Sequence, residues 1–334
     1  MAPEFPYKYK AVHPFLHLPP KFDIINSPMR FLSIVLGVVV APVTMIAVAL
    51  FYFICGLFLS LVEKTVSDHE TPFTGFRKAF ANAVIVLQWR LIIHVQRMFL
   101  VRVDKKKFNK DAHVLISNHQ NMDDVAIHGI FHQPVYLARD DMIDAYGIGK
   151  VLRASRSFLV NQKTSNTHLH EQMKQRSKND IIQIFPEGTV TAQHCVIRFK
   201  PGAFKLDQLV QPVAITYHTA LPSEWLCEKG FKHIYDLACN LFSITTYKYL
   251  DVIENETPDQ AGKRLAEALG VEYLPYTSND WLYFSGKSDD LSKCTKEYLQ
   301  DFGWMGQQKD YQEMCKQKKK NPLYYWDKKT LGVE

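Results

Sequence analysis

The longest apolar stretch of the chain lies near its N-terminus. Residues 31–62 contain no Asp, Glu, Lys or Arg. A helix that crosses a membrane needs about 20 residues at about 1.5 Å each, so this stretch is long for one crossing and short for two. Pro42, Gly37 and Gly56 would allow a kink or a turn. The pattern predicts a membrane-embedded segment after a leader at residues 1–30, either one long helix or a helical hairpin.

Apolar residues then recur at steps of three and four between residues 79 and 103. This stripe consists of Phe80, Val84, Leu87, Leu91, Val95 and Met98. Such spacing is typical of an amphipathic helix, which we place in a linker segment at residues 63–103. Two interpretations remain open, because the helix could lie in a membrane interface or pack on a folded domain.

From residue 104 onward, short apolar runs alternate with polar helical stretches. The runs have the length of buried strands and lie at residues 113–117, 135–138, 158–160, 181–185, 213–217 and 243–253. Helices are expected at residues 164–178 and 258–269. The second of these begins with a capping box at Thr257 and Gln260 and ends at Gly270. The alternation predicts an α/β domain at residues 104–270, with a mixed, largely parallel sheet flanked by helices. An aromatic and lysine-rich extension follows at residues 271–334.

Composition narrows the class of protein further. A chain of 334 residues that is 47% hydrophobic can bury a large core. The net charge of +6 suits a membrane surface or a phosphate-bearing ligand. Nucleic acid would suit it as well, but no nucleic-acid-binding motif accompanies the charge, so we expect no such partner. The six cysteines show no CxxC spacing, which indicates reduced thiols in a cytosolic compartment. Nothing in the sequence indicates an oligomeric state.

The first chemical motif follows the predicted strand that ends at Ser117. It reads Asn118-His119-Gln120-Asn121-Met122-Asp123-Asp124. Catalytic groups of α/β sheets gather at the carboxyl ends of strands. The carboxylate of Asp124 could accept a proton from one imidazole nitrogen of His119 and leave the other nitrogen as a base. By itself, a histidine five residues before an aspartate is a common and often structural pair.

Two further loops could bind a polar ligand. Glu187, Gly188 and Thr189 follow the predicted strand at residues 181–185, where a carboxylate could bind the hydroxyls of a glycerol unit. Lys200 and Gly202 lie in a later loop that could meet a phosphate. Each loop alone is equally compatible with an ordinary surface turn.

Other enzyme classes lack their motifs. No Gly-x-Ser-x-Gly turn is present for a serine hydrolase, and no His-Glu-x-x-His is present for a zinc protease. The segment His168-Leu169-His170-Glu171 fits a solvated helix face better than a set of zinc ligands. We therefore expect no metal site.

The order and spacing of the motifs resemble the glycerolipid acyltransferase family of HxxxxD enzymes. The resemblance rests on His119 and Asp124, then the loop at residues 185–189, the loop at residues 199–204 and Val210-Gln211-Pro212-Val213. The residues at 185–189, 199–204 and 210–213 are most similar to those of the lysophosphatidylcholine acyltransferase branch. The resemblance covers residues 100–270, and the apolar stretch ahead of the domain fits it.

The resemblance implies a specific chemistry. His119, held by Asp124, would deprotonate an acceptor hydroxyl that attacks the thioester of acyl-CoA, which is a co-substrate rather than a bound cofactor. Asn118, the Glu187–Gly188–Thr189 loop, Lys200 and Gly202 would contribute to substrate binding. The acceptor would be a lysophospholipid, with a lysophosphatidylcholine-type lipid favoured and lysophosphatidate or glycerol 3-phosphate as alternatives. The family implies a glycerol-3-phosphate acyltransferase-like fold on the endoplasmic reticulum or a related membrane, with the site facing the cytosol.

Two positions depart from the family pattern. The second block of the family ends in an arginine where this chain has Gln162, with Arg156 nearby, and Val190 stands where an arginine often follows the threonine of the third block. These replacements affect the expected phosphate-binding part of the site. They also motivate the alternative of a catalytically weak relative that binds lipid or scaffolds a membrane complex.

Overall fold

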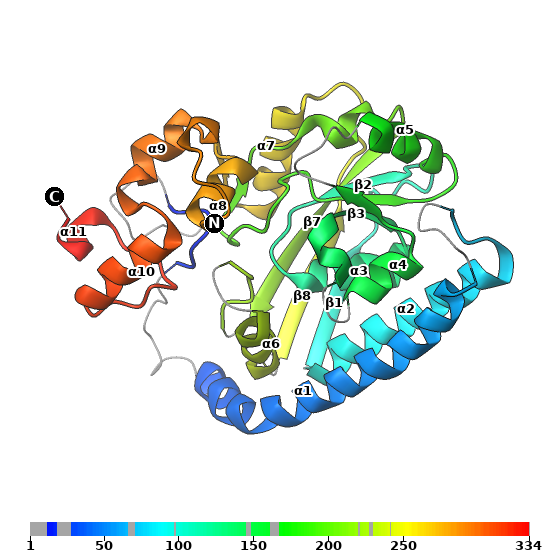
Figure 1. Ribbon diagram of the computed structural model, residues 1–334, viewed down its shortest axis with the longest axis horizontal. Coiled ribbons are helices and arrows are strands. Elements are labelled where there is room, and N and C mark those ends of the chain that lie inside the picture. Colours follow the sequence, from blue (N-terminus) through cyan, green and yellow to red (C-terminus); the bar gives the residue numbers. More distant parts are fainter. Residues whose placement is uncertain are drawn as a thin grey trace.

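A seven-stranded sheet forms the centre of the molecule (Figure 1). The computed structural model describes residues 12–18, 28–65, 71–96, 98–144, 148–160, 167–219, 221–226, 230–240 and 242–333. The strand order is β1-β8-β7-β2-β5-β3-β4. The strands are β1 (Met98–Asp104), β2 (Val114–Ser117), β3 (Val135–Arg139), β4 (Phe158–Val160), β5 (Ile182–Ile184), β7 (Val210–Thr219) and β8 (Phe242–Tyr249). Only the β7–β8 pair is antiparallel among the described strands of this sheet.

Helices cover both faces of the sheet. One apolar core joins the sheet to α1 (Pro28–Glu63), α2 (Gly75–Gln96), α3 (Met122–His132) and α4 (Ile148–Ala154). A second core packs the other face against α5 (Thr167–Arg176), η2 (Pro201–Lys205) and α7 (Pro258–Leu269). The predicted mixed, largely parallel α/β fold is therefore confirmed.

A smaller unit adjoins this domain. β6 (Cys195–Ile197) pairs in parallel with β9 (Glu272–Leu274) in a separate two-stranded sheet. The helices and turns that follow are α8 (Ser278–Phe284), η3 (Leu291–Lys293), α9 (Lys296–Phe302), η4 (Gly303–Met305), α10 (Gln308–Gln317) and α11 (Lys328–Leu331). Apart from η3, these elements share a core with Phe15 and Leu16, which are fully buried. The segment at residues 12–18 thus packs on the C-terminal extension.

The apolar stretch forms one continuous helix, α1, with Pro42 inside it. No hairpin forms within residues 28–63, so of the two predicted alternatives the single helix is confirmed. Its part Gly37–Glu63 is, by length and composition, long and apolar enough to cross a membrane. The remaining α6 (Gly230–Cys239) packs across α1.

The prediction of one helix over residues 79–103 is wrong at its C-terminal end. The helix, α2, ends at Gln96, and residues from Met98 form β1, which pairs with β8 over its whole length. The stripe is also displaced, because Leu87 is exposed whereas Gln88 and Trp89 are buried. Met98, the first residue of β1, continues the helical spacing of the apolar residues in α2. The sequence pattern therefore does not separate the helix from the strand.

Most other expected elements are confirmed within a few residues. The predicted strands correspond to β2, β3, β4, β5, β7 and β8, and the two helices to α5 and α7. α7 has the expected capping box, with reciprocal hydrogen bonds between Thr257 and Gln260, and ends at Gly270 in the left-handed conformation. Local cap chemistry therefore sets both ends of this helix.

Candidate active site

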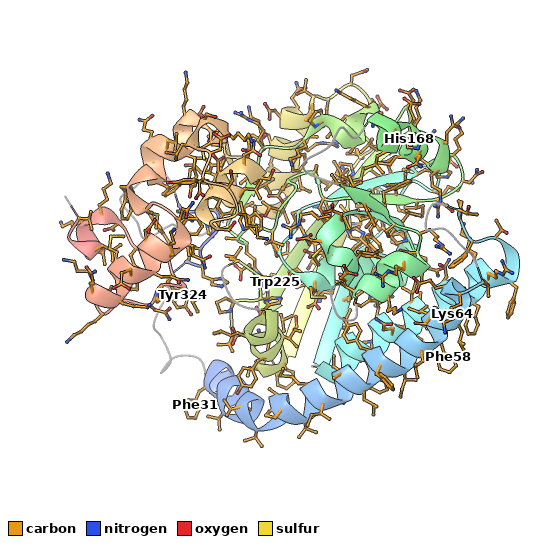
Figure 2. All side chains as sticks on the ribbon, in the orientation of Figure 1. Phe31, Phe58, Lys64, His168, Trp225 and Tyr324 are labelled. Carbon is orange, nitrogen blue, oxygen red and sulfur yellow. The ribbon has the colours of Figure 1, made fainter. Side chains whose placement is uncertain are left out.

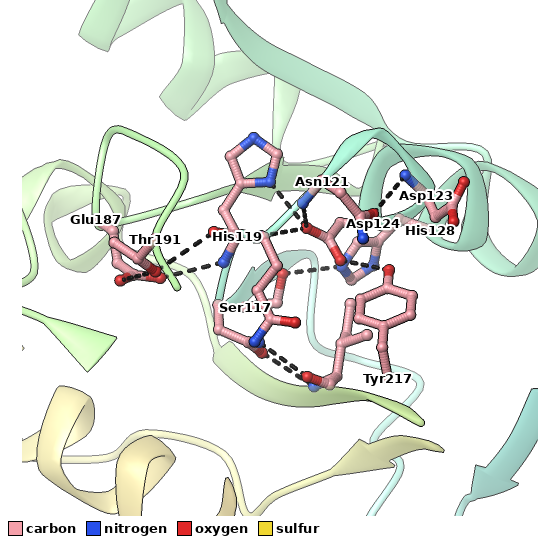
Figure 3. A network of polar contacts seen from close by, with 12 residues as sticks. Ser117, His119, Asn121, Asp123, Asp124, His128, Glu187, Thr191 and Tyr217 are labelled. Atoms are coloured by element: carbon pink, nitrogen blue, oxygen red, sulfur yellow. Dashed lines mark hydrogen bonds and ion pairs between the residues drawn. The ribbon is translucent and has the colours of Figure 1, made fainter. Parts of the chain in front are cut away.

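The side chains of His119 and Asp124 face each other at the carboxyl end of β2 (Figure 3). Nδ1 of His119 lies 3.0 Å from Oδ2 of Asp124. Asp124 is fully buried, whereas the imidazole keeps about a fifth of its surface exposed. The second ring nitrogen points away from the aspartate and from the polar network (Figure 3). The pair thus has the predicted arrangement, with an oriented ring and a free outer edge.

The helix that follows the motif fixes Asp124. Asp124 is the third residue of α3, and Asn121 is its N-cap residue. Oδ2 of Asp124 accepts backbone hydrogen bonds from Gln120 at 2.6 Å and Asn121 at 3.0 Å, and so completes a capping box. The five-residue spacing between His119 and Asp124 places the histidine in the turn and the aspartate in the first turn of the helix. One carboxylate therefore closes the helix end and orients the imidazole.

Two aromatic residues that the sequence analysis did not single out complete the surroundings. The hydroxyl of Tyr217, on β7, donates to Oδ1 of Asp124 at 2.5 Å. The ring of Phe185 stacks on the imidazole of His119, with centroids 3.9 Å apart and planes 17° apart. The only signal for Tyr217 was its place in a predicted strand, because the sequence does not say that β7 is the neighbour of β2.

Glu187 supports the backbone of the turn that holds His119. Its Oε1 accepts from the backbone N–H of His119 at 3.1 Å. Its Oε2 accepts from the backbone N–H of Ile197 and from the hydroxyl of Thr191. Burial raises the pKa of the Glu187 carboxyl to about 8, although its three donors act in the opposite direction. Glu187 is fully buried, so in this structure its oxygens face protein donors.

The same loop holds the turn from its other side. The backbone N–H of Thr191 donates to the carbonyl oxygen of His119 at 2.8 Å. From the loop after β7, the backbone N–H of Trp225 donates to the carbonyl oxygen of Gln120 at 2.8 Å. The backbone N–H and the carbonyl group of His119 are thus both held by the loop that follows β5. The motif at residues 118–124 and the loop that contains Glu187 therefore form one structural unit.

Gly188 and Lys200 lie against each other. Gly188 has φ +72°, a conformation that favours glycine, and a Cβ built there would be 2.9 Å from Nζ of Lys200. The side chain of Lys200 therefore crosses the face of the glycine. Partial burial of the Lys200 side chain lowers the pKa of its ammonium group, although the residue as a whole remains exposed. A cation with a partly lost water shell beside Gly188 could meet an anionic group.

The remaining predicted site residues have mainly structural contacts. Both ends of the Asn118 amide bond the backbone of Ile215, which ties β2 to β7. Thr189 is buried. Gly202 lies in η2, with open space around its Cα. Gln162 lies outside the described residues. Val190 is half-buried, and Arg156 is buried with its guanidinium 4.0 Å from the ring centroid of Phe73.

A second histidine lies beneath the site. His128, on α3, is fully buried, with Nε2 3.0 Å from the hydroxyl of Ser117 and Nδ1 2.8 Å from that of Tyr247. Burial holds its pKa well below the usual value, so it is neutral. It stabilises the junction of β2 with α3, and of the two histidines only His119 has an exposed edge.

A groove at the opposite edge of the sheet is not part of this site. It has a volume of about 950 Å³ and is lined mainly by residues of the loops after β1 and β8, among them Lys106, Lys107 and Asp251, and by Arg264 of α7. These loops lie at the amino end of β2. None of the described residues that line the groove is a histidine or cysteine.

Comparison with known proteins gives one family. Residues 100–216 match the family model described as Acyltransferase. The chain is 24% identical to lysophosphatidylcholine acyltransferase 2 of Homo sapiens over 279 residues, which cover 77% of this chain and 51% of that protein. It is 26% identical to the lysophospholipid acyltransferase LPCAT4 of Mus musculus, covering 71% and 49%. It is 33% identical to lysophosphatidylcholine acyltransferase 1 of Danio rerio over 150 residues, covering 40% and 29%.

One solved structure is also similar. The crystal structure of the 1-acyl-sn-glycerophosphate acyltransferase PlsC of Thermotoga maritima matches with a TM-score of 0.47 and 15% identity, covering 69% of this chain and 95% of that one. The chain spans about half the length of the first two relatives named above.

Proposed function

We propose, from the match of residues 100–216 to the Acyltransferase family model, that the protein is a membrane-bound enzyme that transfers an acyl group from acyl-CoA to the free hydroxyl of a lysophospholipid. A lysophosphatidylcholine-type acceptor is favoured by the names of the relatives. Lysophosphatidate and glycerol 3-phosphate are the alternatives. The proposed location is the endoplasmic reticulum or a related internal membrane, with the site on the cytosolic side.

The observation that carries the proposal is the contact between His119 and Asp124. The carboxylate faces Nδ1 at 3.0 Å, so Nδ1 carries the proton and the outer nitrogen, Nε2, is free to accept one. A base in this position contributes about 10²–10⁴ to the rate of a hydroxyl reaction. The stacked ring of Phe185 limits rotation of the imidazole and shields one of its faces from water.

The proposed reaction is a direct transfer. Nε2 of His119 takes the proton of the acceptor hydroxyl while that oxygen attacks the thioester carbonyl carbon. The tetrahedral intermediate collapses, the carbon–sulfur bond breaks, and the imidazolium returns its proton to the thiolate of CoA. The buried carboxylate of Asp124 stabilises the imidazolium between the two steps. The products are the esterified lipid and free CoA.

The decisive experiment replaces the histidine. His119→Ala should abolish transfer from labelled acyl-CoA and leave the protein folded and bound to membranes. His168→Ala is the matched control, because His168 lies on the outer surface of α5 (Figure 2) and should have no effect. Activity of His119→Ala within threefold of the wild type would refute the mechanism.

The alternative is a catalytically weak relative that binds lipid. Val190, where the family often has an arginine, is the observation that motivates it. Purified protein given acyl-CoA and a panel of lysophosphatidylcholine, lysophosphatidylethanolamine and lysophosphatidate should release free CoA if it is an enzyme. Binding of these lipids without release of CoA would favour the alternative.

A further inference from the structure

The described part of the leader, residues 12–18, lies between the C-terminal extension and the loops around His119. Its side chains are mostly buried, and Figure 1 shows the segment in dark blue among the helices of the extension. The backbone of His17 accepts a hydrogen bond from the N–H of Tyr325 at 2.8 Å and donates one to the carbonyl oxygen of Leu323 at 3.3 Å. This part of the leader is therefore attached to the folded extension.

The same segment contacts the loop that follows β5. The backbone N–H of Ala192 donates to the carbonyl oxygen of Pro14 at 3.0 Å. The preceding residue, Thr191, donates its backbone N–H to the carbonyl oxygen of His119 at 2.8 Å. Two consecutive backbone donors of this loop thus bind the leader on one side and the turn that carries His119 on the other.

The loop that follows β7 holds the next two residues of that turn. The backbone N–H of Trp225 donates to the carbonyl oxygen of Gln120, and the carbonyl oxygen of Ser223 accepts from the side-chain amide of Asn121 at 3.0 Å. Glu224 lies between these two loop residues and is buried. Both sequence neighbours of Glu224 therefore bind the turn that carries His119.

The carboxylate of Glu224 joins this loop to the two other segments. Its Oε1 accepts from the backbone N–H of Gln193 at 3.2 Å, and its Oε2 lies 3.5 Å from Nδ1 of His17. Burial acts to raise the pKa of Glu224, but the interactions with His17 and with the backbone N–H of Gln193 prevail and lower this pKa to about 2. The carboxylate is therefore an ion whose charge is balanced from the leader.

We propose that Glu224 is a positioning residue for acyl transfer, held in place by docking of the leader through His17. This assignment rests on the function proposed above. Glu224 acts on His119 through the backbone of the loops after β5 and β7, which meet at its carboxylate. The leader would then belong to the active site, although it lies outside the residues 100–216 that match the family model.

Electrostatics explains why the leader matters to this loop. A buried carboxylate that loses its charged partner is strongly destabilised, because its desolvation is no longer compensated. Without His17, the loop after β7 would move so that water reaches Glu224, and its bonds to Gln120 and Asn121 would weaken. A shift of about 1 Å at a reacting group can reduce a rate by about 10²-fold. Docking of the leader would thus set the rate of transfer.

Kinetics of four variants separate positioning from simple packing. Glu224→Ala should lower kcat by about 10²-fold and leave KM for both substrates within about twofold. Glu224→Gln should stay within about threefold of the wild type, because its amide oxygen can still accept from Gln193. Glu313→Ala, on an exposed residue of α10, is the matched control and should behave as the wild type does.

The fourth variant and its combination with Glu224→Gln test the charge itself. His17→Leu fills a similar space without a charge and leaves the buried carboxylate unpaired, so kcat should fall by about tenfold. Adding Glu224→Gln removes that carboxylate and should restore most of the activity. If the combined variant is no more active than His17→Leu alone, the leader acts by packing and the proposal is overturned.

Amide hydrogen exchange on the full chain in detergent micelles tests the coupling without catalysis. In Glu224→Ala, the amides of Gln193 and Trp225 should exchange at least about tenfold faster, while those of α7 keep their rates and so exclude global unfolding. Unchanged exchange at Trp225 would overturn the proposal, and so would faster exchange with an unchanged kcat. If the wild type releases no CoA, the proposed function fails, whereas exchange at Trp225 still decides whether Glu224 holds the loops.

Discussion

The hydroxyl of Tyr217 and the imidazole of His119 bind opposite oxygens of Asp124, at 2.5 Å and 3.0 Å. The carboxylate is buried, and every hydrogen bond that holds it also fixes the orientation of the imidazole. Tyr217 acts on the imidazole through Asp124, so we assign it as a positioning residue. Its hydrogen bond to a charged acceptor belongs to the stronger class.

Tyr217→Phe should therefore reduce kcat by about tenfold and leave KM for both substrates within twofold. A hydrogen bond to a charged group contributes about 1.5–3 kcal/mol, and about 1.4 kcal/mol corresponds to a factor of ten in rate. Steady-state kinetics and a thermal unfolding curve would be measured on the same preparation. An unchanged kcat with a lower melting temperature would mean that Tyr217 serves stability alone.

Asp124→Asn should reduce kcat by about 10²–10⁴. The amide is nearly isosteric but neutral, so it cannot stabilise the imidazolium, and either its oxygen or its NH₂ group can take the place of Oδ2, which faces Gln120, Asn121 and Nδ1 of His119. The tautomer with the free outer nitrogen is then no longer enforced. Asp140→Asn, on an exposed residue of η1, is the matched control and should remain fully active. Activity of Asp124→Asn within threefold of the control would contradict the assigned role.

The sequence predicts which helices and strands form better than it predicts which of them lie side by side. His119 and Asp124 were found because both lie in one local motif, in which a capping box and a strand end are encoded together. Phe185 was predicted as the last residue of a strand, but its stacking on His119 depends on the pairing of β2 with β5. Strand order is decided by packing between segments that lie far apart in the sequence. The hydrophobic periodicity of a single segment does not contain that information.

The contacts of residues 12–18 in the leader could not be predicted from local sequence either. Residues 12–18 carry apolar side chains without a helical or strand period, so nothing local assigns Phe15 and Leu16 to a core. They are fully buried only because the C-terminal extension provides a partner more than 250 residues later. The error at residues 98–103 arose in the opposite way, since a local pattern matched two structures equally well.

Glu187→Gln should change how stability depends on pH. The pKa of Glu187 is raised to about 8 in the folded protein, above the usual value of 4.5, so the folded state holds a proton that the unfolded state releases. This makes the folded protein lose stability as the pH rises from about 4.5 to 8. The glutamine variant lacks that proton, so its stability should fall less over the same range.

Urea unfolding at pH 5 and pH 8 would measure the difference. The glutamine variant should also be less stable at both values, by about 1–3 kcal/mol, because its NH₂ group faces the backbone donor of either His119 or Ile197. Equal pH slopes for the wild type and the variant would show that Glu187 is ionised throughout. Thr191→Val, which removes one donor to the same carboxyl, is a useful third sample and should raise the pKa further.

Gly188→Ala and Lys200→Met should act on the same step of substrate binding. A Cβ at Gly188 would be 2.9 Å from Nζ of Lys200 and would displace the ammonium, and a φ of +72° adds about 1–2 kcal/mol of strain for an L-residue. If the ammonium binds the phosphate of the acceptor, each variant should raise KM for a lysophospholipid by about tenfold and leave kcat within threefold. Lys205→Met, an exposed lysine at the end of η2, should change neither constant.

The double variant separates a shared role from two independent ones. Because the glycine acts only by leaving room for Lys200, the combined change should raise KM little beyond either single change, a non-additivity that a double-mutant cycle detects. A monoacylglycerol acceptor, which has no phosphate, should bind all three variants as it binds the wild type. A multiplied effect of the two substitutions, or an equal loss with the phosphate-free acceptor, would show that Lys200 supports the loop rather than the substrate anion.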